Sequence, residues 1–105
     1  MFLFLIACIY IEPPDAPNIT INEVTLTSII ISWTIPALHE DDTIQEYEVL
    51  FNNSVESIAA DADRIFTANG LTENTVYTFE VRAVGTNTGP GALKRRDIST
   101  LARER

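Results

Sequence analysis

The sequence is poor in the residues that build disulfides, metal sites and active sites. Cys8 is the only cysteine and His39 the only histidine among 105 residues. A single cysteine excludes an intrachain disulfide and a cysteine-based zinc site, and a single histidine cannot form a histidine-based metal site. No credible Ser/His/Asp or Cys/His set and no glycine-rich phosphate loop is present. We therefore predict a chain without enzymatic activity, without a metal or other cofactor, and without a small-molecule substrate.

Basic residues are scarce over most of the chain. The first 93 residues contain two basic and thirteen acidic side chains, a net charge of −11, and the whole chain carries −8. Such a surface repels phosphates and argues against nucleic-acid binding. Residues 94–105 are the exception, with five basic and two acidic residues. Two interpretations stay open: a solvated edge strand with its tail, or a weak contact with an acidic glycan through Lys94, Arg95 and Arg96.

No hydrophobic run is long enough to cross a bilayer, which takes about 20 residues. The longest is the uncharged segment 1–11, followed by the proline-rich segment 12–17. We consider three interpretations of residues 1–11: a short signal segment cleaved near Ala7, the remnant of a transmembrane helix, or an extra strand. Residues 1–13 are accordingly taken as a leader and linker, and contact with a membrane is expected only through this segment.

Sustained helical periodicity is also missing, and the apolar residues instead alternate or form short runs. Segment 44–51 is an example, because its alternation puts Tyr47, Val49 and Phe51 on one face and Glu46 and Glu48 on the other. Turn-forming residues separate such segments at intervals of 8–12 residues, which is typical of a sandwich. Strands are predicted at 18–22, 28–34, 44–51, 55–60, 64–68, 77–84 and 97–101.

Several residues in this order resemble the fibronectin type III family over residues 14–101. Trp33 and Tyr47 match aromatic positions of the second and third strands, and Leu71 precedes Tyr77 with the spacing of the family's tyrosine corner. The resemblance also rests on Pro17, on Val81–Val84 and on Gly89-Pro90-Gly91, while Glu73 and Gly85 depart from the family's proline and asparagine. It implies an all-β, immunoglobulin-like sandwich of seven strands, three against four, with a charged tail at 102–105.

The corner implies a specific hydrogen bond. In such a corner the tyrosine hydroxyl bonds back to the backbone upstream of the strand. We expect Tyr77→Phe to cost on the order of 1–3 kcal/mol, the penalty for an unmade buried hydrogen bond. Trp33, Tyr47, Leu71 and Tyr77 are the predicted structural core.

The resemblance implies a non-catalytic protein-interaction module in an extracellular adhesion, receptor or matrix setting. The alternative is a passive spacer or accessory domain of a larger enzyme, such as a receptor phosphatase, a receptor kinase or a polysaccharide hydrolase. An intracellular cytoskeletal module fits the lack of disulfides but not the apolar start. Contacts with a protein partner are expected from the loops 37–43 and 85–91, and the sheet face with Glu46 and Glu48 is the other candidate surface. The candidate residues in the loops are His39, Glu40, Asp41, Asp42, Thr86, Asn87 and Thr88.

Two further motifs have a chemical interpretation. Asn18-Ile19-Thr20 and Asn52-Asn53-Ser54 are acceptor triplets for N-glycosylation, so Asn18 and Asn52 are candidate sites in a secreted chain. Asp61-Ala62-Asp63 lacks the rest of a calcium-binding loop and is interpreted as a turn.

Overall fold

The computed structural model describes residues 12–39 and 42–103. The three interpretations of segment 1–11, and the predicted contact residues Glu40 and Asp41, lie outside the described residues. The described part contains eight strands: β1 (Ile19–Val24), β2 (Ile29–Trp33), β3 (Ile44–Phe51), β4 (Ser54–Ala59), β5 (Ile65–Ala68), β6 (Val76–Gly85), β7 (Gly89–Pro90) and β8 (Lys94–Ser99).

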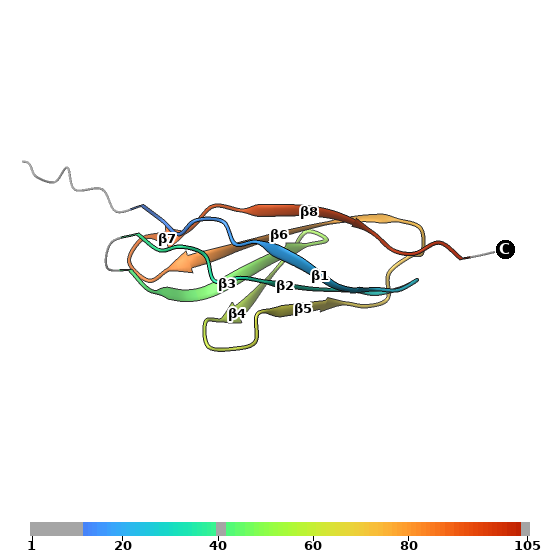
Figure 1. Cartoon of the computed structure of the whole chain (residues 1–105), viewed down its shortest axis with the longest axis horizontal. Helices are drawn as coiled ribbons and strands as arrows, with labels where there is room; N and C mark the ends of the chain where they lie inside the picture. Colours follow the sequence, from blue (N-terminus) through green and yellow to red (C-terminus); the bar gives the residue numbers. More distant parts are fainter. Residues whose placement is uncertain (1–11, 40–41, 104–105) are drawn as a thin grey trace, which may run out of the picture.

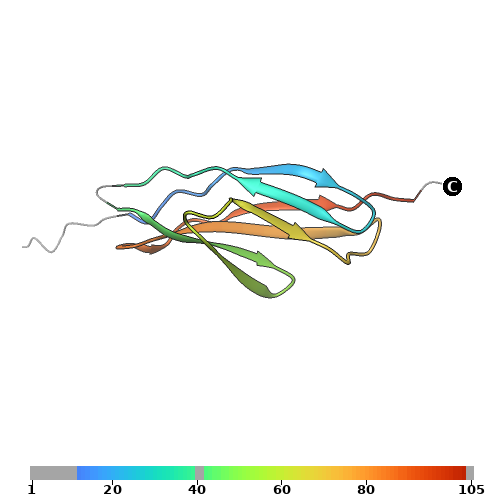
Figure 2. The ribbon, with the colours of Figure 1, turned by 90° about the horizontal axis from the view of Figure 1, so that it is seen from below.

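The strands form two packed antiparallel sheets (Figure 1). One sheet has the order β1-β2-β5, and the other has the order β4-β3-β6-β8. The short β7 pairs with the end of β6 beside β8. The all-β sandwich is confirmed. The expected three-against-four arrangement holds for the longer strands, and the two-residue β7 is a fifth strand of the larger sheet. Figure 2 shows the two layers from the side, with the β3–β4 hairpin projecting from them.

The largest difference from the predicted boundaries is in the last strand. β8 begins at Lys94, three residues before the predicted start, because it pairs with β6 from Val81↔Lys94 to Val76↔Ser99. Backbone pairing does not depend on apolar side chains, so an apolar pattern misses the three basic residues. They belong to a strand at the edge of the sheet.

The core lies between the sheets and consists of the inward-facing residues of each strand. In β2 and β6 buried residues alternate with more exposed ones, as a strand with one face on a core requires. Trp33, Tyr47 and Leu71 all belong to it, and Tyr77 is half-buried and packs against it. The buried apolar residues are Ile19, Ile29, Ile31, Trp33, Tyr47, Val49, Ala68, Leu71, Phe79, Val81, Ala83 and Ile98.

Aromatic side chains bridge the two sheets at two places. Trp33 of β2 meets Tyr47 of β3 edge-on, with ring centroids 5.8 Å apart. Further along, Phe51 stacks on Phe79 at 4.6 Å, and Phe66 of the opposite sheet contacts both rings edge-on. Offset and edge-on pairs of this kind add stability beyond the apolar area that they bury.

The proline-rich segment 12–17 packs against the sandwich from Pro14 onward. Pro14 and Pro17 are fully buried. The backbone N–H of Ala92 donates to Pro14 O at 3.1 Å. A Cβ at Gly91 would lie 2.3 Å from the same carbonyl oxygen, so only glycine lets the two backbones approach this closely.

Candidate interaction site

The two loops predicted to contact a partner lie side by side at one end of the sandwich. The backbone N–H of Thr86 donates to Thr43 O at 2.8 Å, and the hydroxyl groups of the same two threonines are hydrogen-bonded at 2.8 Å. The loop before β3 is thereby joined to the loop between β6 and β7, at the end of the molecule where the described chain begins (Figure 1).

The carboxylate of Asp42 joins the two loops by hydrogen bonds. Its Oδ1 accepts hydrogen bonds from the backbone N–H groups of Thr43 at 2.8 Å and Asn87 at 2.9 Å. Its Oδ2 accepts a short hydrogen bond from the hydroxyl of Thr88. The residue is only 7% exposed. The carboxylate thus closes a clamp across a chain separation of about 45 residues, and we call these four residues the Asp42 clamp.

The clamp favours the ionised carboxylate. The hydroxyl of Thr88 and then the amide of Asn87 hold the pKa of Asp42 below its usual value of 3.8, against the opposing effect of burial. Hydrogen bonds donated to a carboxylate stabilise its charged form. Protonation of Asp42 should therefore weaken the clamp.

Gly85 leaves the room that the clamp needs. A Cβ at this position would lie 2.2 Å from Asp42 Oδ2 and 2.3 Å from Thr88 Oγ1, closer than real contacts allow. This glycine, which departs from the asparagine of the family pattern, is thus explained by the carboxylate beside it.

The other candidates of the loop pair are placed around the clamp. Thr86 and Asn87 are exposed, and Thr88 is half-buried. His39 lies toward the segment 12–17, where its Nε2 is 2.9 Å from Asp15 Oδ1 and 3.6 Å from Glu12 Oε1. Leu38, beside His39, is 37% exposed, so the exposed side chains at this end are not all polar, while the carboxylate of Asp42 is hydrogen-bonded within the molecule. Their contact with a partner stays a prediction.

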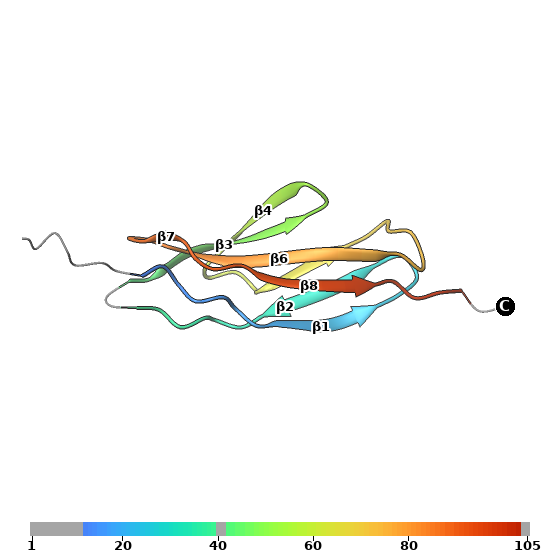
Figure 3. The ribbon, with the colours of Figure 1, turned by 90° about the horizontal axis from the view of Figure 1, so that it is seen from above.

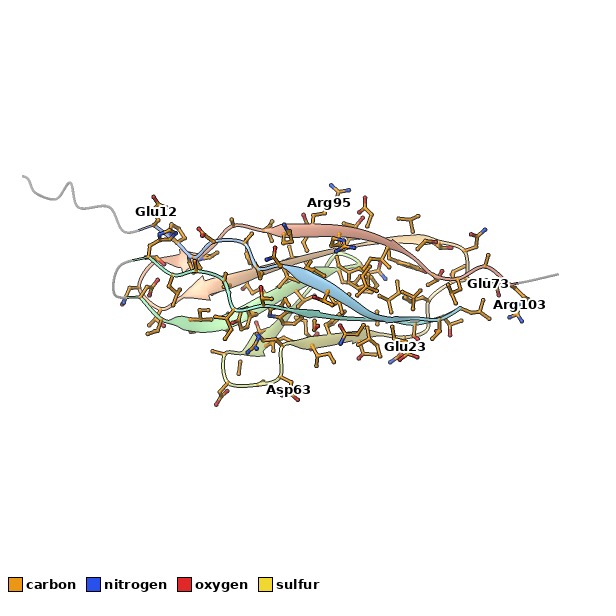
Figure 4. All side chains as sticks on the ribbon, viewed as in Figure 1. Glu12, Glu23, Asp63, Glu73, Arg95 and Arg103 are labelled. Carbon is orange, nitrogen blue, oxygen red and sulfur yellow. The ribbon has the colours of Figure 1, made fainter. Side chains whose placement is uncertain are left out.

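The acidic sheet face and the basic cluster are less distinct than the sequence indicates. Arg82 Nε donates to Glu48 Oε1 at 2.7 Å, which neutralises one acid of the face formed with Glu46. Because side chains alternate along β8, Arg95 lies on the opposite side of the strand from Lys94 and Arg96. Figure 4 shows Arg95 pointing away from β8 into solvent. The three basic side chains therefore do not share one face of the strand. Their contact with a glycan stays a prediction.

Both glycosylation candidates are accessible. Asn18 is exposed immediately before β1, and Asn52 is exposed in the turn between β3 and β4. The turn residues Asn52 and Asn53 have φ values of 53° and 64°, a conformation that asparagine tolerates better than most residues. Modification of either site stays a prediction.

Residues 12–39 and 42–103 contain neither a clustered metal site nor a membrane-spanning helix. No group of three or more His, Cys, Asp or Glu side chains in these ranges is arranged to hold a metal ion. No helix long and apolar enough to cross a membrane occurs in the same ranges.

A groove on the outer face of the larger sheet is not predicted by the sequence. It has a volume of about 610 Å³ and lies between the β3–β4 hairpin and the beginning of β6. No sequence signal indicates it, because its walls come from segments more than 20 residues apart. Its apolar lining includes Leu50, Val55 and Val76.

Comparison with known proteins agrees with this geometry. The sequence pattern of the family "Fibronectin type III domain" matches residues 12–94. The chain belongs to this family. It is 34% identical over 84 residues to Chitinase 63 of Streptomyces plicatus, covering 77% of the chain and 13% of the chitinase. It is also 34% identical over 73 residues to Tenascin-R of Mus musculus, covering 70% and 5%.

Solved structures show the same fold at low sequence identity. A computationally redesigned β sandwich protein superposes with a TM-score of 0.72 at 21% identity, covering 91% of this chain and 96% of the other. Chitinase ChiA74 from Bacillus thuringiensis gives 0.67 at 20% identity, covering 87% of this chain and 14% of the other. The chain thus spans a small part of the long relatives that it matches, and the domain it forms also occurs within larger proteins.

Proposed function

We propose that the chain is a non-catalytic protein-interaction module that contacts its partner through the loop pair. The observation that supports this most directly is the Asp42 clamp. It holds two loops from distant parts of the chain in one arrangement, and a preorganised surface loses less conformational entropy on binding. The exposed Thr86 and Asn87 and the half-buried His39 then offer hydrogen-bonding groups at fixed positions.

We further propose an extracellular setting, as part of an adhesion, receptor or matrix protein. The similarity to Tenascin-R supports this, as does the apolar segment 1–11 if it directs export. Arrival of the chain in the culture medium after expression with its own N-terminus would support export. Retention inside the cell as the intact chain would contradict it.

Photocrosslinking tests the loop pair even though the partner is unidentified. A photoreactive residue replaces Asn87 in one variant and the exposed Thr67 of β5 in a control variant. We expect one protein to be captured from position 87 and not from position 67, and to be lost when Asp42→Ala is added. Crosslinking from position 67 alone would contradict the proposal, and so would crosslinking from position 87 that Asp42→Ala does not reduce.

A second candidate is an accessory domain of a larger polysaccharide-degrading enzyme, and the similarity to Chitinase 63 and Chitinase C supports it. Among the described residues every exposed large hydrophobic side chain is aliphatic, so no aromatic ring is offered as a flat platform for a sugar. We therefore expect such a domain to act as a spacer, and the chain to stay in solution when insoluble chitin is pelleted. Depletion by chitin would instead indicate direct contact with the polysaccharide.

A further inference from the structure

The longer outer strands of the two sheets, β1, β5, β8 and β4, differ in how their free edges are protected. An exposed edge presents backbone donors and acceptors, and proteins protect such edges with bulges, basic residues, short length or proline. β1 has a register shift between Ile21 and Glu23. β5 is only four residues long. β8 begins with three basic residues, and Arg96 Nη1 donates to Ile19 O of the other sheet at 3.1 Å.

β4 has little of this protection. It is six residues long, its register with β3 is continuous from Phe51↔Ser54 to Glu46↔Ala59, and it contains no proline, lysine or arginine. It pairs with β3 alone among the strands of the described chain. Five of its six residues are exposed. Figure 3 shows β4 at the outside of the hairpin that projects from the sandwich, so approach to its edge is open.

The turn determines which backbone groups face outward. Asn52 and Asn53 both have positive φ, as in a two-residue hairpin turn, and such a turn is closed by a hydrogen-bonded pair, here Phe51 and Ser54. In an antiparallel ladder hydrogen-bonded and non-hydrogen-bonded pairs alternate. The residues of β4 that direct their N–H and C=O away from β3 are therefore Val55, Ser57 and Ala59, and of these groups the C=O of Ala59 already accepts a hydrogen bond from the N–H of Ala62 at 3.0 Å.

The acidic residues around the edge of β4 favour a basic binding partner. From Asn52 to Asp63 the chain carries the acids Glu56, Asp61 and Asp63 and no basic residue. A second copy of the chain would bring the same acids and another net charge of −8 to the contact. An extended segment with basic side chains would instead meet opposite charge, and complementary charge favours encounter as well as register.

We propose that β4 is a docking edge for an extended basic segment of a partner, which adds a strand to the larger sheet beside β4. The added strand pairs with the backbone of Val55 and Ser57 and with the N–H of Ala59, since the C=O of Ala59 is bonded to Ala62. Its basic side chains lie near Glu56 and the acids of the turn after β4. Strand addition of this kind takes affinity from main-chain hydrogen bonds and specificity from side chains. The edge lies on β4, so the proposal does not depend on the loop pair.

The probe is a fluorescent heptapeptide of alternating lysine and valine, titrated into the full chain and followed by anisotropy. A peptide in which proline replaces each valine has the same charge but lacks the backbone N–H at every second residue, and it is the control probe. We expect the lysine–valine peptide to bind and to slow amide exchange at Val55, Ser57 and Ala59. Equal binding of both peptides would show charge attraction alone and would overturn the proposal.

A matched pair of variants tests the backbone contact. Ser57→Pro removes an outward N–H, and proline is tolerated on an edge strand in that orientation. Ser57→Ala keeps the N–H. We expect Ser57→Pro to weaken binding by about tenfold or more, the effect of one lost hydrogen bond of about 1.4 kcal/mol, and Ser57→Ala to leave it unchanged. Unchanged binding by a folded Ser57→Pro chain would overturn the proposal.

A charge variant and a self-association control complete the test. Glu56→Lys keeps every backbone group and should also weaken binding, so the proposal stays testable if Ser57→Pro fails to fold. Sedimentation of the chain without peptide should show a monomer. A dimer that Ser57→Lys abolishes would assign the edge to a second copy of the chain and overturn the basic occupant.

Discussion

The two ends of the sandwich are closed by different chemistry. At the loop end, the carboxylate of Asp42 accepts three hydrogen bonds and joins the loops around Thr43 and Thr88. At the opposite end, the corresponding hydrogen bonds are made by neutral hydroxyl groups. The Tyr77 hydroxyl accepts from the backbone N–H of Thr72 at 2.8 Å, and the buried Thr100 hydroxyl donates to Thr72 O at 2.7 Å.

The difference separates a closure made by a carboxylate from a closure made by neutral hydroxyl groups, although the corner end also carries the exposed ion pair of Glu73 and Arg103. Removing or protonating the Asp42 carboxylate changes the loop end, while the hydrogen bonds of the corner are made by the hydroxyl groups of Tyr77 and Thr100. The corner end is also tied to the core through Leu71, which is 8% exposed and whose N–H donates to Thr27 O at 2.8 Å. We therefore expect changes at the corner to affect global stability, and changes at the Asp42 clamp to affect mainly the loops.

The largest effect is expected from Leu71→Ala. This change deletes a buried side chain at the corner, which typically costs about 2–5 kcal/mol through lost burial and the cavity left behind. Leu101→Ala is the matched control, because that leucine is 52% exposed and its loss should stay within about 0.5 kcal/mol. Urea unfolding followed by Trp33 fluorescence measures both. Equal midpoints for the two variants would show that the corner does not anchor the fold.

Thr100→Val should have the next largest effect. The Thr100 hydroxyl accepts from the N–H of Thr75 at 3.1 Å as well as donating to Thr72 O, and the residue is 3% exposed. Valine leaves both backbone groups without this partner, at a cost of about 1–3 kcal/mol. Thr67→Val, on the exposed face of β5, is the control and should be nearly neutral. The same unfolding assay applies, and similar losses in both variants would contradict the assignment.

Tyr77→Phe is expected to cost less than the corner pattern alone predicts. The sequence implies a buried hydrogen bond, but the bond to Thr72 lies at an exposed position. Water can replace the lost partner there, so the cost falls to about 0.5–1.5 kcal/mol. Amide exchange should show lost protection at Thr72 and no change at Thr86 of the opposite end. A stability loss without a local change at Thr72 would show that the hydroxyl acts elsewhere.

The same contrast explains how much of the molecule is predictable from its sequence. The corner is local: Leu71 and Tyr77 are six residues apart, and the alternation after Tyr77 fixes which side chains face the core. For the same reason the predicted limits of β3, 44–51, agree with the structure, since its alternation ends at the Asn52-Asn53 turn. Local periodicity and turn chemistry thus determine the strands.

The Asp42 clamp is not predictable in this way. Asn87 and Thr88 lie 45 and 46 residues beyond Asp42, and no local pattern links such distant positions. In the sequence Asp42 is one of three adjacent acids, which favours a solvated loop and a contact role. Only the packing of two loops at one end of the sandwich turns it into a buried acceptor. The exposed edge of β4 has a similar origin, because strand order decides which strand is outermost.

The smallest global effect, and the clearest separation of the two ends, is expected from changes at Asp42. Because the pKa of Asp42 is lower in the folded than in the unfolded chain, the unfolded chain binds more protons between the two values. The resulting stability is fully present above about pH 4 and is lost as the pH falls through the folded value. Asp97 has a lowered pKa for a related reason, because it accepts a hydrogen bond from the Thr78 hydroxyl.

These two carboxylates make a matched pair. Asp42→Asn keeps an oxygen for the amides of Thr43 and Asn87 but removes the titration, so amide protection at Asn87 should no longer fall in acid. Asp97→Asn should also flatten the acid dependence of unfolding while leaving the dependence at Asn87 unchanged. Asp42→Ala removes the acceptor itself and should expose the Asn87 amide at every pH. If acid lowers the amide protection at Asn87 equally in all three variants, the pH response belongs to another group. The carboxylate of Asp42 would then not distinguish the two ends of the sandwich.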